Sequence, residues 1–167
     1  MQNNNPIIEK TERAIDKYKQ VVYGVALTHL RYRADADDVF QEVFLLYFNK
    51  AIVFSDDEHE KAWLIRTTIN LCKKSNASIW HTRTISLEDE NYSLENILFE
   101  TPEENTLFTE LTALSPKYRI VLYLRYFENM PLNDIARILK IRPDAVRKRI
   151  SRGRAMLKER LERDYFE

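Results

Sequence analysis

The stretch that decides the fold is residues 131–157, PLNDIARILKIRPDAVRKRISRGRAML. Its first half carries an apolar row with helical spacing, formed by Leu132, Ile135, Ala136 and Leu139. Its second half carries another such row, formed by Val146, Ile150, Gly153 and Leu157. Two amphipathic helices joined by a short turn, here KIRP at 140–143, are predicted to form a helix-turn-helix.

The second of these helices has a strongly basic face opposite its apolar row. Residues 142–154 hold six basic side chains and one acidic one. The outward-facing set is Arg147, Lys148, Ser151 and Arg152, with Arg149 and Arg154 at its flanks. Arginine can read guanine edges in the major groove, and lysine or flanking arginine can neutralise phosphates. The pattern favours a DNA-recognition helix, although a solvated basic helix, or one that binds an acidic protein or a membrane surface, has the same composition.

Two further helices are predicted just before this pair. Pro116 opens one that ends around Asn129. The earlier one starts at Thr101, which can cap it, with Pro102 in the first turn. Glu104 is expected to complete a capping box with Thr101.

The N-terminal half is predicted to hold three helices. They cover about Ile7–Leu30, Asp35–Asn49 and Ala62–Ser75. Asp35 is expected to cap the second helix, and IVFSDDEHE at 52–60 interrupts the pattern before the third. The third helix carries a polar strip at helical spacing, made of Arg66, Asn70, Lys73 and Lys74. A solvated helix face has the same pattern.

Charge is distributed unevenly along the 167 residues, although 26 basic and 26 acidic side chains cancel overall. The basic and acidic counts are 11 and 11 over residues 1–82, 1 and 8 over 83–115, and 14 and 7 over 116–167. This division predicts a first domain, an acidic linker and a basic second domain, at residues 1–81, 82–100 and 101–167.

Composition favours an all-α fold with two small helical domains, because the chain has only 2 glycines and 5 prolines. The single Cys72 and three scattered histidines offer no zinc spacing, and a lone cysteine fits a reducing cytoplasm. The N-terminus lacks the apolar core of a signal peptide, and no apolar run is long enough to span a bilayer. We therefore expect a cytoplasmic protein without membrane insertion, cofactor or metal.

The motifs together resemble the extracytoplasmic-function (ECF) sigma factors of the sigma-70 family. The C-terminal half is similar to their region four in four motifs that occur in the same order. These are a Leu-Pro start at 114–116, a Leu-Arg-Tyr-Phe run at 124–127, a Glu-Ile-Ala-like triplet at 134–136 and a basic recognition helix at 146–149. The N-terminal half is similar to region two, through ADADDVFQEVFLLYF at 34–48 and AWLIRTTINLCKK at 62–74. The resemblance covers most of residues 15–161.

The resemblance implies a transcription initiation factor that binds core RNA polymerase and promoter DNA and is held inactive by an anti-sigma factor. Region two would bind the polymerase clamp helices, on or beside Asp38, Gln41, Glu42 and Phe44, although Phe44 fits simple core equally well. It would capture melted minus-10 DNA with Phe54 and the polar strip Arg66, Asn70, Lys73 and Lys74. Region four would read the minus-35 duplex through the basic helix. About 20 extended linker residues span up to roughly 65 Å, enough to bridge the two promoter elements.

Two other classes of protein compete with this interpretation. A stand-alone helix-turn-helix regulator would bind its operator without polymerase. An enzyme is disfavoured by the lack of a phosphate loop, nucleophile elbow or metal motif, and the clustered acids of residues 35–42 suit a helix start and a polymerase contact better than a metal site. The turn also departs from the usual pattern: Lys140 stands where glycine is common, and Pro131 and Arg142 stand where a capping Ser or Thr is usual.

Overall fold

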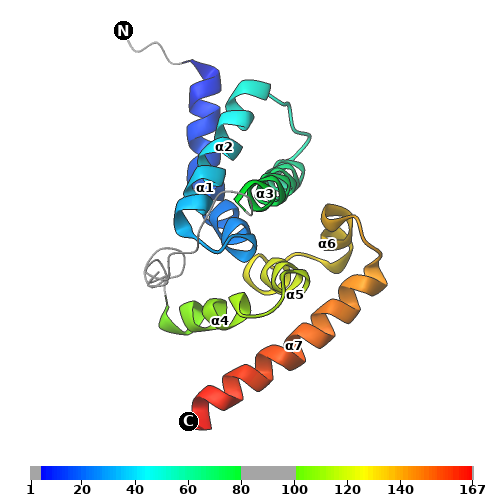
Figure 1. Ribbon diagram of the computed structural model, residues 1–167. Coiled ribbons are helices and arrows are strands. Elements are labelled where there is room, and N and C mark those ends of the chain that lie inside the picture. The colour runs from blue at the N-terminus through cyan, green and yellow to red at the C-terminus, as the bar shows by residue number, and fades with distance from the viewer. Residues whose placement is uncertain (1–4, 80–100, 167) are drawn as a thin grey trace. The chain divides into compact units, whose positions relative to one another are not determined.

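The computed structural model describes residues 5–79 and 101–166 and shows helices throughout (Figure 1). No strand occurs within those two ranges, which confirms the all-α prediction. The described residues form two compact units, one before and one after residue 90. The predicted linker at 82–100 lies outside the described residues, as does most of the acidic segment.

The first unit is a bundle of three helices. They are α1 (Pro6–His29), α2 (Arg33–Lys50) and α3 (Asp57–Ile79), and each packs on the other two. The α1 helix starts at a capped end, because Asn5 Oδ1 accepts a hydrogen bond of 3.1 Å from the Ile7 amide. The core is made of apolar side chains from all three helices, including Val22, Val25, Val43, Leu64 and Ile65.

Two helix starts in this unit differ from the sequence prediction. The α2 helix begins at Arg33, so Asp35 is not its cap but a buried residue of its first turn. The α3 helix begins at Asp57, well before Ala62, because Asp56 Oδ1 accepts a 2.7 Å hydrogen bond from the His59 amide and caps the helix there. The interruption between α2 and α3 is therefore only six residues long, 51–56.

The second unit contains the helix-turn-helix. Its elements are α4 (Pro102–Thr112), α5 (Pro116–Leu122), the π-helical segment η2 (Tyr123–Phe127), α6 (Leu132–Leu139) and α7 (Pro143–Phe166). Thr101 caps α4 as predicted, since its Oγ1 accepts a 3.2 Å hydrogen bond from the Glu104 amide. Phe108 packs edge-on against Tyr123 and Phe127, whose rings stack on each other.

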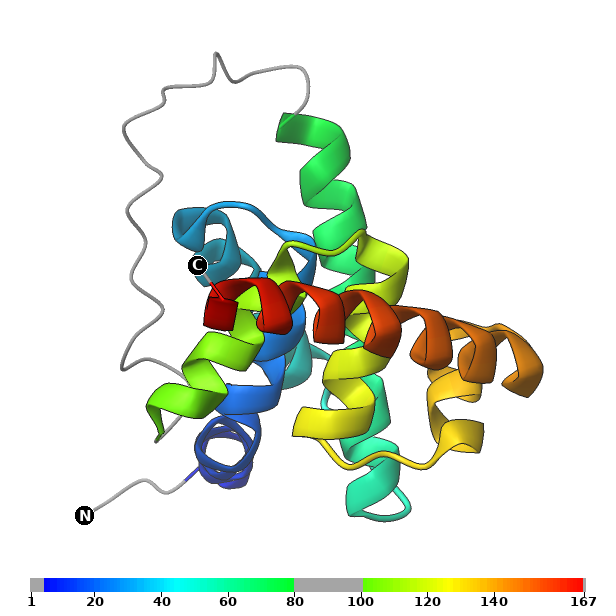
Figure 2. The same cartoon turned by 90° about the horizontal axis from the view of Figure 1, so that it is seen from below.

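The turn between α6 and α7 has the expected departures from ideal chemistry. Lys140 adopts a left-handed conformation with φ of 56°, which costs a non-glycine residue about 1 kcal/mol. Pro131 precedes α6 without a side-chain cap. The α7 helix nevertheless packs firmly, because all four residues of its predicted apolar row are buried. Figure 2 shows α7 crossing α5, with which it makes its main contact.

No helix in the described ranges is both long enough and apolar enough to cross a membrane.

Candidate functional site

The basic face of α7 is accessible in the second unit, as the apolar row predicts. The side chains of Arg147, Lys148, Ser151, Arg152 and Arg154 are exposed, and Arg149 is half-buried. Burial of Val146 and Ile150 forces these charges outward, because residues on opposite faces of a helix cannot share one environment. The face therefore presents cations and one hydroxyl on a rigid helix.

Two of these arginines already have partners within the unit. Arg147 Nη1 donates to Asp144 Oδ1 at 2.5 Å, one helical turn away. The Arg154 guanidinium lies 5.9 Å from the centre of the Tyr126 ring. The Arg147–Asp144 ion pair lies at the surface, where such a pair contributes little to stability. Both contacts therefore mainly restrict the side-chain rotamers of the two arginines.

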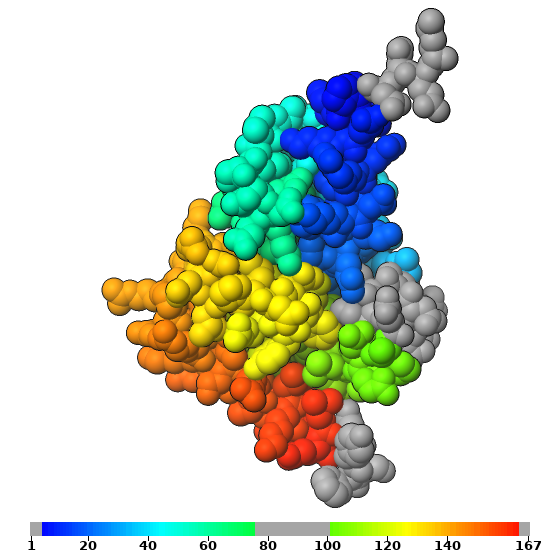
Figure 3. All heavy atoms as spheres, turned by 180° about the vertical axis from the view of Figure 1, so that it is seen from behind, coloured from blue at the N-terminus to red at the C-terminus, as the bar shows by residue number. Residues whose placement is uncertain are grey.

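The basic face continues beyond α7 onto the π-helical segment. A shallow hollow of about 370 Å³ lies between η2, α6 and α7, and its lining includes Arg125, Tyr126, Arg147 and Arg154. Arg125 Nη1 donates to the Met130 carbonyl at 3.0 Å, and the residue as a whole is exposed. Figure 3 shows the surface of α5 and η2, in yellow, between α4 in green and the yellow-orange to orange surface of α6 and the start of α7. Sequence reasoning gave Arg125 and Tyr126 no role, although both lie in the quoted Leu-Arg-Tyr-Phe run.

The exposed face of α2 carries the acidic motif of the first unit. Asp38, Gln41 and Glu42 are exposed, as expected for a binding surface. Phe44 is only 5% exposed and packs between Phe40 and Tyr47. Of the two alternatives for Phe44, this burial favours simple core, and its place beside a polymerase-binding surface stays a prediction.

Two apolar side chains take the place that sequence reasoning gave to Phe44. Leu45 is 60% exposed and Phe48 is 36% exposed, three and six residues after Glu42. Helical spacing places them on the face of Gln41 and Glu42. Exposed large apolar side chains next to polar ones are typical of a protein-binding surface. We call Asp38, Gln41, Glu42, Leu45 and Phe48 the α2 surface.

The other acids near the start of α2 serve the fold. The Tyr23 hydroxyl donates to Asp37 Oδ1 at 2.5 Å, and burial together with this hydrogen bond raises the pKa of Tyr23 to about 12. Asp35 is buried. Across the described residues, no three His, Cys, Asp or Glu side chains gather as metal ligands would.

The polar strip of α3 is only partly exposed. Asn70, Lys73 and Lys74 face solvent, whereas Arg66 is half-buried. The Arg66 Nε atom is buried without a hydrogen-bond partner among the described residues. Three of the four residues of the strip are thus exposed.

Phe54 lies in the 51–56 connection and forms part of an aromatic cluster. Its ring stacks on Tyr47 with centres 5.9 Å apart and meets Trp63 at 5.9 Å. The His59 ring packs edge-on against it at 5.2 Å. Phe54 remains half-buried, so one part of the ring is accessible.

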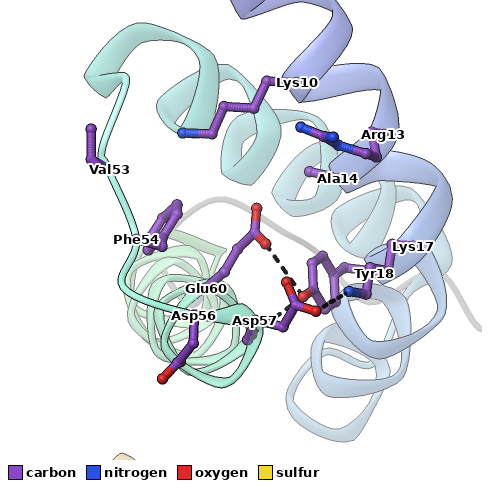
Figure 4. A pocket seen from close by; sticks show the side chains of 10 residues that line it. All are labelled: Lys10, Arg13, Ala14, Lys17, Tyr18, Val53, Phe54, Asp56, Asp57 and Glu60. Atoms are coloured by element: carbon purple, nitrogen blue, oxygen red, sulfur yellow. Dashed lines mark hydrogen bonds and ion pairs between the residues drawn. The ribbon is translucent and has the colours of Figure 1, made fainter.

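A pocket of about 460 Å³ opens beside Phe54, between α1 and the start of α3 (Figure 4). Its floor is tied together by Glu60, which accepts hydrogen bonds from the hydroxyls of Tyr47 at 2.5 Å and Tyr18 at 3.3 Å. Burial, with the hydrogen bond to Glu60, raises the pKa of Tyr47 well above its usual range. This volume falls in the range of roughly 300–1,000 Å³ that small-molecule sites occupy.

Comparison with known families accounts for both units. Residues 14–80 match the family model of sigma-70 region 2, and residues 105–157 match that of sigma-70 region 4. Together the two matches span well over half of the chain, and they place the α2 surface and α3 in the first region and the basic face of α7 in the second.

Two similar proteins match this chain over most of their own length. The ECF RNA polymerase sigma factor SigW of Bacillus subtilis is 27% identical over 88% of this chain and 86% of its own length. The ECF RNA polymerase sigma-E factor of Haemophilus influenzae is 28% identical over 89% and 85%.

Two solved structures share the fold. CnrH, in complex with the cytosolic domain of CnrY, has a TM-score of 0.66 at 21% identity and covers 96% of this chain and 92% of its own. The sigma factor RpoE, in complex with the anti-sigma factor NepR from Bartonella quintana, has a TM-score of 0.72 at 16% identity, with coverage of 92% and 98%.

Proposed function

Because this chain belongs to the ECF type of the sigma-70 family, we propose that its first unit binds core RNA polymerase and melted promoter DNA while its second unit binds the promoter duplex. It is a promoter-directing sigma factor and not a stand-alone regulator, since regions 2 and 4 occur together in one chain. The observation that carries the division of labour is the pair of separate exposed faces, one on each unit. The proposed boundaries are residues 1–81 for the first domain, 82–100 for the linker and 101–167 for the second domain.

The polymerase contact is assigned to the α2 surface. Asp38 and Glu42 provide charge, while Leu45 and Phe48 provide apolar area that is costly to leave in water. Interfaces commonly combine a buried apolar centre with a polar rim, and this face offers both within three helical turns. Phe44 supports it from the core through its contacts with Phe40 and Tyr47.

The minus-35 contact is assigned to α7. Arg147, Lys148, Ser151 and Arg152 lie opposite the buried row and are the candidates for base reading. Arg149 and Arg154 lie at the edges of this face and are assigned to phosphates. The exposed Arg125 of η2 extends the same phosphate-binding edge.

The minus-10 contact is assigned to the first unit. Phe54 offers a half-exposed ring on which an unstacked base can lie, next to a pocket large enough for it. The exposed Asn70, Lys73 and Lys74 follow the strand along α3. Arg66, whose side chain is half-buried, is assigned to the start of this path.

Partners and location follow from this role. An anti-sigma factor is the proposed regulator, supported by the relative in fold RpoE, which was solved in complex with the anti-sigma factor NepR. A factor that binds RNA polymerase acts in the cytoplasm, which is the proposed location of this chain. We propose that the chain has no catalytic activity and no cofactor of its own.

Reconstitution tests the proposal directly. The purified chain is added to sigma-free core polymerase with a library of random-sequence promoter duplexes, and run-off transcripts are sequenced. Promoter-specific transcripts that require the chain are expected. Tight duplex binding by the chain without polymerase, combined with no transcript, would contradict the assignment.

A further inference from the structure

Three cations of α1 line the pocket beside Phe54. Lys10, Arg13 and Lys17 follow one another at spacings of three and four residues, so they lie on one face of the helix. Figure 4 shows this basic wall across the pocket from Phe54 and the start of α3. Sequence reasoning placed every minus-10 contact on α3 and its preceding loop, and none on α1.

Two of the three cations already interact with other residues of the first unit. Lys10 Nζ donates to the Ile52 carbonyl at 2.5 Å and lies 5.5 Å and 5.3 Å from the ring centres of Tyr47 and Phe54. Lys17 Nζ pairs with Asp57 at 2.8 Å, and this hydrogen bond raises the pKa of Lys17. Lys10 thus holds the 51–56 connection, and Lys17 holds the start of α3.

Arg13 differs from its two neighbours. Its side chain is exposed, and within the described ranges it forms no hydrogen bond or ion pair. The acids across the pocket are already engaged: Glu60 accepts from two tyrosines, Asp57 pairs with Lys17, and Asp56 Oδ1 caps α3. Among the described residues, Arg13 is therefore the lining cation whose hydrogen-bond donors remain available.

The ring of Phe54 and the guanidinium of Arg13 lie on opposite walls of one pocket. A nucleotide has a flat base that stacks on an aromatic ring and a phosphate that a guanidinium binds through two parallel hydrogen bonds. The pocket thus offers one wall for each part of a nucleotide.

We propose that Arg13 binds a backbone phosphate of the melted strand, at the nucleotide whose base enters the pocket beside Phe54. The inference rests on the proposed minus-10 role of the first unit and adds α1 to the DNA-binding surface. Lys10 acts as a positioning residue, because it fixes the connection that carries Phe54.

Salt dependence tests the contact. The probe is a fluorescein-labelled single strand that carries the minus-10 element selected in the run-off experiment, bound to core polymerase loaded with the full chain. Each phosphate contact to a single strand contributes about 0.7 to the slope of log affinity against log salt. We expect Arg13→Ala to lower this slope by about 0.7 and the affinity by about tenfold at low salt.

Lys19→Ala is the matched control, because Lys19 is an exposed cation of the same helix that does not line the pocket. It removes the same charge and should leave the slope unchanged. Equal effects of Arg13→Ala and Lys19→Ala would overturn the proposal, since they would reflect net charge alone.

Neutral methylphosphonate linkages, introduced one at a time, locate the phosphate. One position should weaken binding of the wild-type complex and have no further effect on Arg13→Ala; additive losses at every position would overturn the contact. Phe54→Ala distinguishes failure of the Arg13 contact from failure of the minus-10 role of the pocket. If Phe54→Ala weakens binding and Arg13→Ala does not, only the Arg13 contact fails, whereas no effect of either variant removes the pocket from minus-10 binding.

Discussion

Gly153 of α7 packs directly on Leu122 of α5, so closely that a Cβ atom at position 153 would lie 2.9 Å from Leu122 Cδ1. Leu122 is fully buried, and the same Cβ would meet Tyr118 Cβ at 3.4 Å. The glycine is needed for this close approach of two helices and not for an unusual backbone conformation, since it lies within a regular helix. This contact fixes the distance of α7 from the core of the second unit.

Gly153→Val should therefore destabilise the second unit by about 1–3 kcal/mol, because added methyl groups overpack a filled core. Hydrogen exchange followed by mass spectrometry would localise faster exchange to α5 and α7. Ala155→Val is the control, because Ala155 is exposed on the same helix and should change stability by about 0.5 kcal/mol. Similar exchange rates in both variants would mean that α7 can shift away from α5 at little cost.

Base reading and phosphate binding by α7 should separate by mutation. Arg147→Ala or Arg152→Ala should cost about 1–3 kcal/mol at the cognate minus-35 site and relax preference at particular base pairs. Arg154→Ala should weaken all sequences alike and lower the salt slope by about one unit. A holoenzyme binding survey over single-base variants measures both. Uniform losses for Arg147 and Arg152 would make the helix a phosphate clamp without reading function.

Charge reversal on the α2 surface should weaken polymerase binding. Glu42→Lys is expected to lower affinity for core polymerase at least about tenfold, since opposed like charges at an interface cost more than 1.4 kcal/mol. Circular dichroism should show unchanged helicity, because Glu42 is exposed. Glu12→Lys on the exposed face of α1 serves as the control, and core affinity that is equal for the two variants would count against the assignment.

Promoter opening should depend on the α3 strip. The double variant Asn70→Ala/Lys74→Ala should reduce permanganate reactivity of the melted element more than it reduces binding of closed duplex. Asn49→Ala/Lys50→Ala, an exposed pair of the same residue types on α2, should leave both unchanged. Equal loss of opening and duplex binding in the α3 variant would contradict this division of roles.

Burial of the Tyr23 hydroxyl, together with its hydrogen bond to Asp37, predicts a pH dependence of stability. The pKa of Tyr23 is about 12 in the folded protein against an ordinary value of 10.0, so its contribution is fully present below pH 10 and is lost as pH rises through 12. Tyr23→Phe should lower the free energy of unfolding by about 1 kcal/mol at pH 8. In urea titrations this difference should shrink towards pH 12; a difference that stays constant would show that the hydroxyl does not titrate late.

The sequence alone predicted which segments are helical, although not where α2 and α3 begin, because apolar rows recur every three or four residues wherever a helix face is buried. Val146, Ile150 and Gly153 predicted the buried side of α7, and burial of these residues confirms it. The cap at Thr101 was predictable because its hydrogen bond is local, reaching only to Glu104. The cap at Asp56 escaped prediction because the aromatic and acidic residues around it suggested a longer loop.

The tertiary structure alone decided two things. It decided which of two adjacent apolar residues is buried, and which of several cations on one helix face has a partner within the protein. Phe44 and Leu45 are adjacent and both apolar, and the packing of α2 against α1 and α3 places the first in the core and leaves the second 60% exposed. Lys10, Arg13 and Lys17 are equivalent by spacing, yet Ile52 and Asp57, about 40 residues further along the chain, occupy the lysines. Helical periodicity determines which side of a helix is buried, whereas contacts between residues distant in sequence determine which side chains on the other side remain available to a partner.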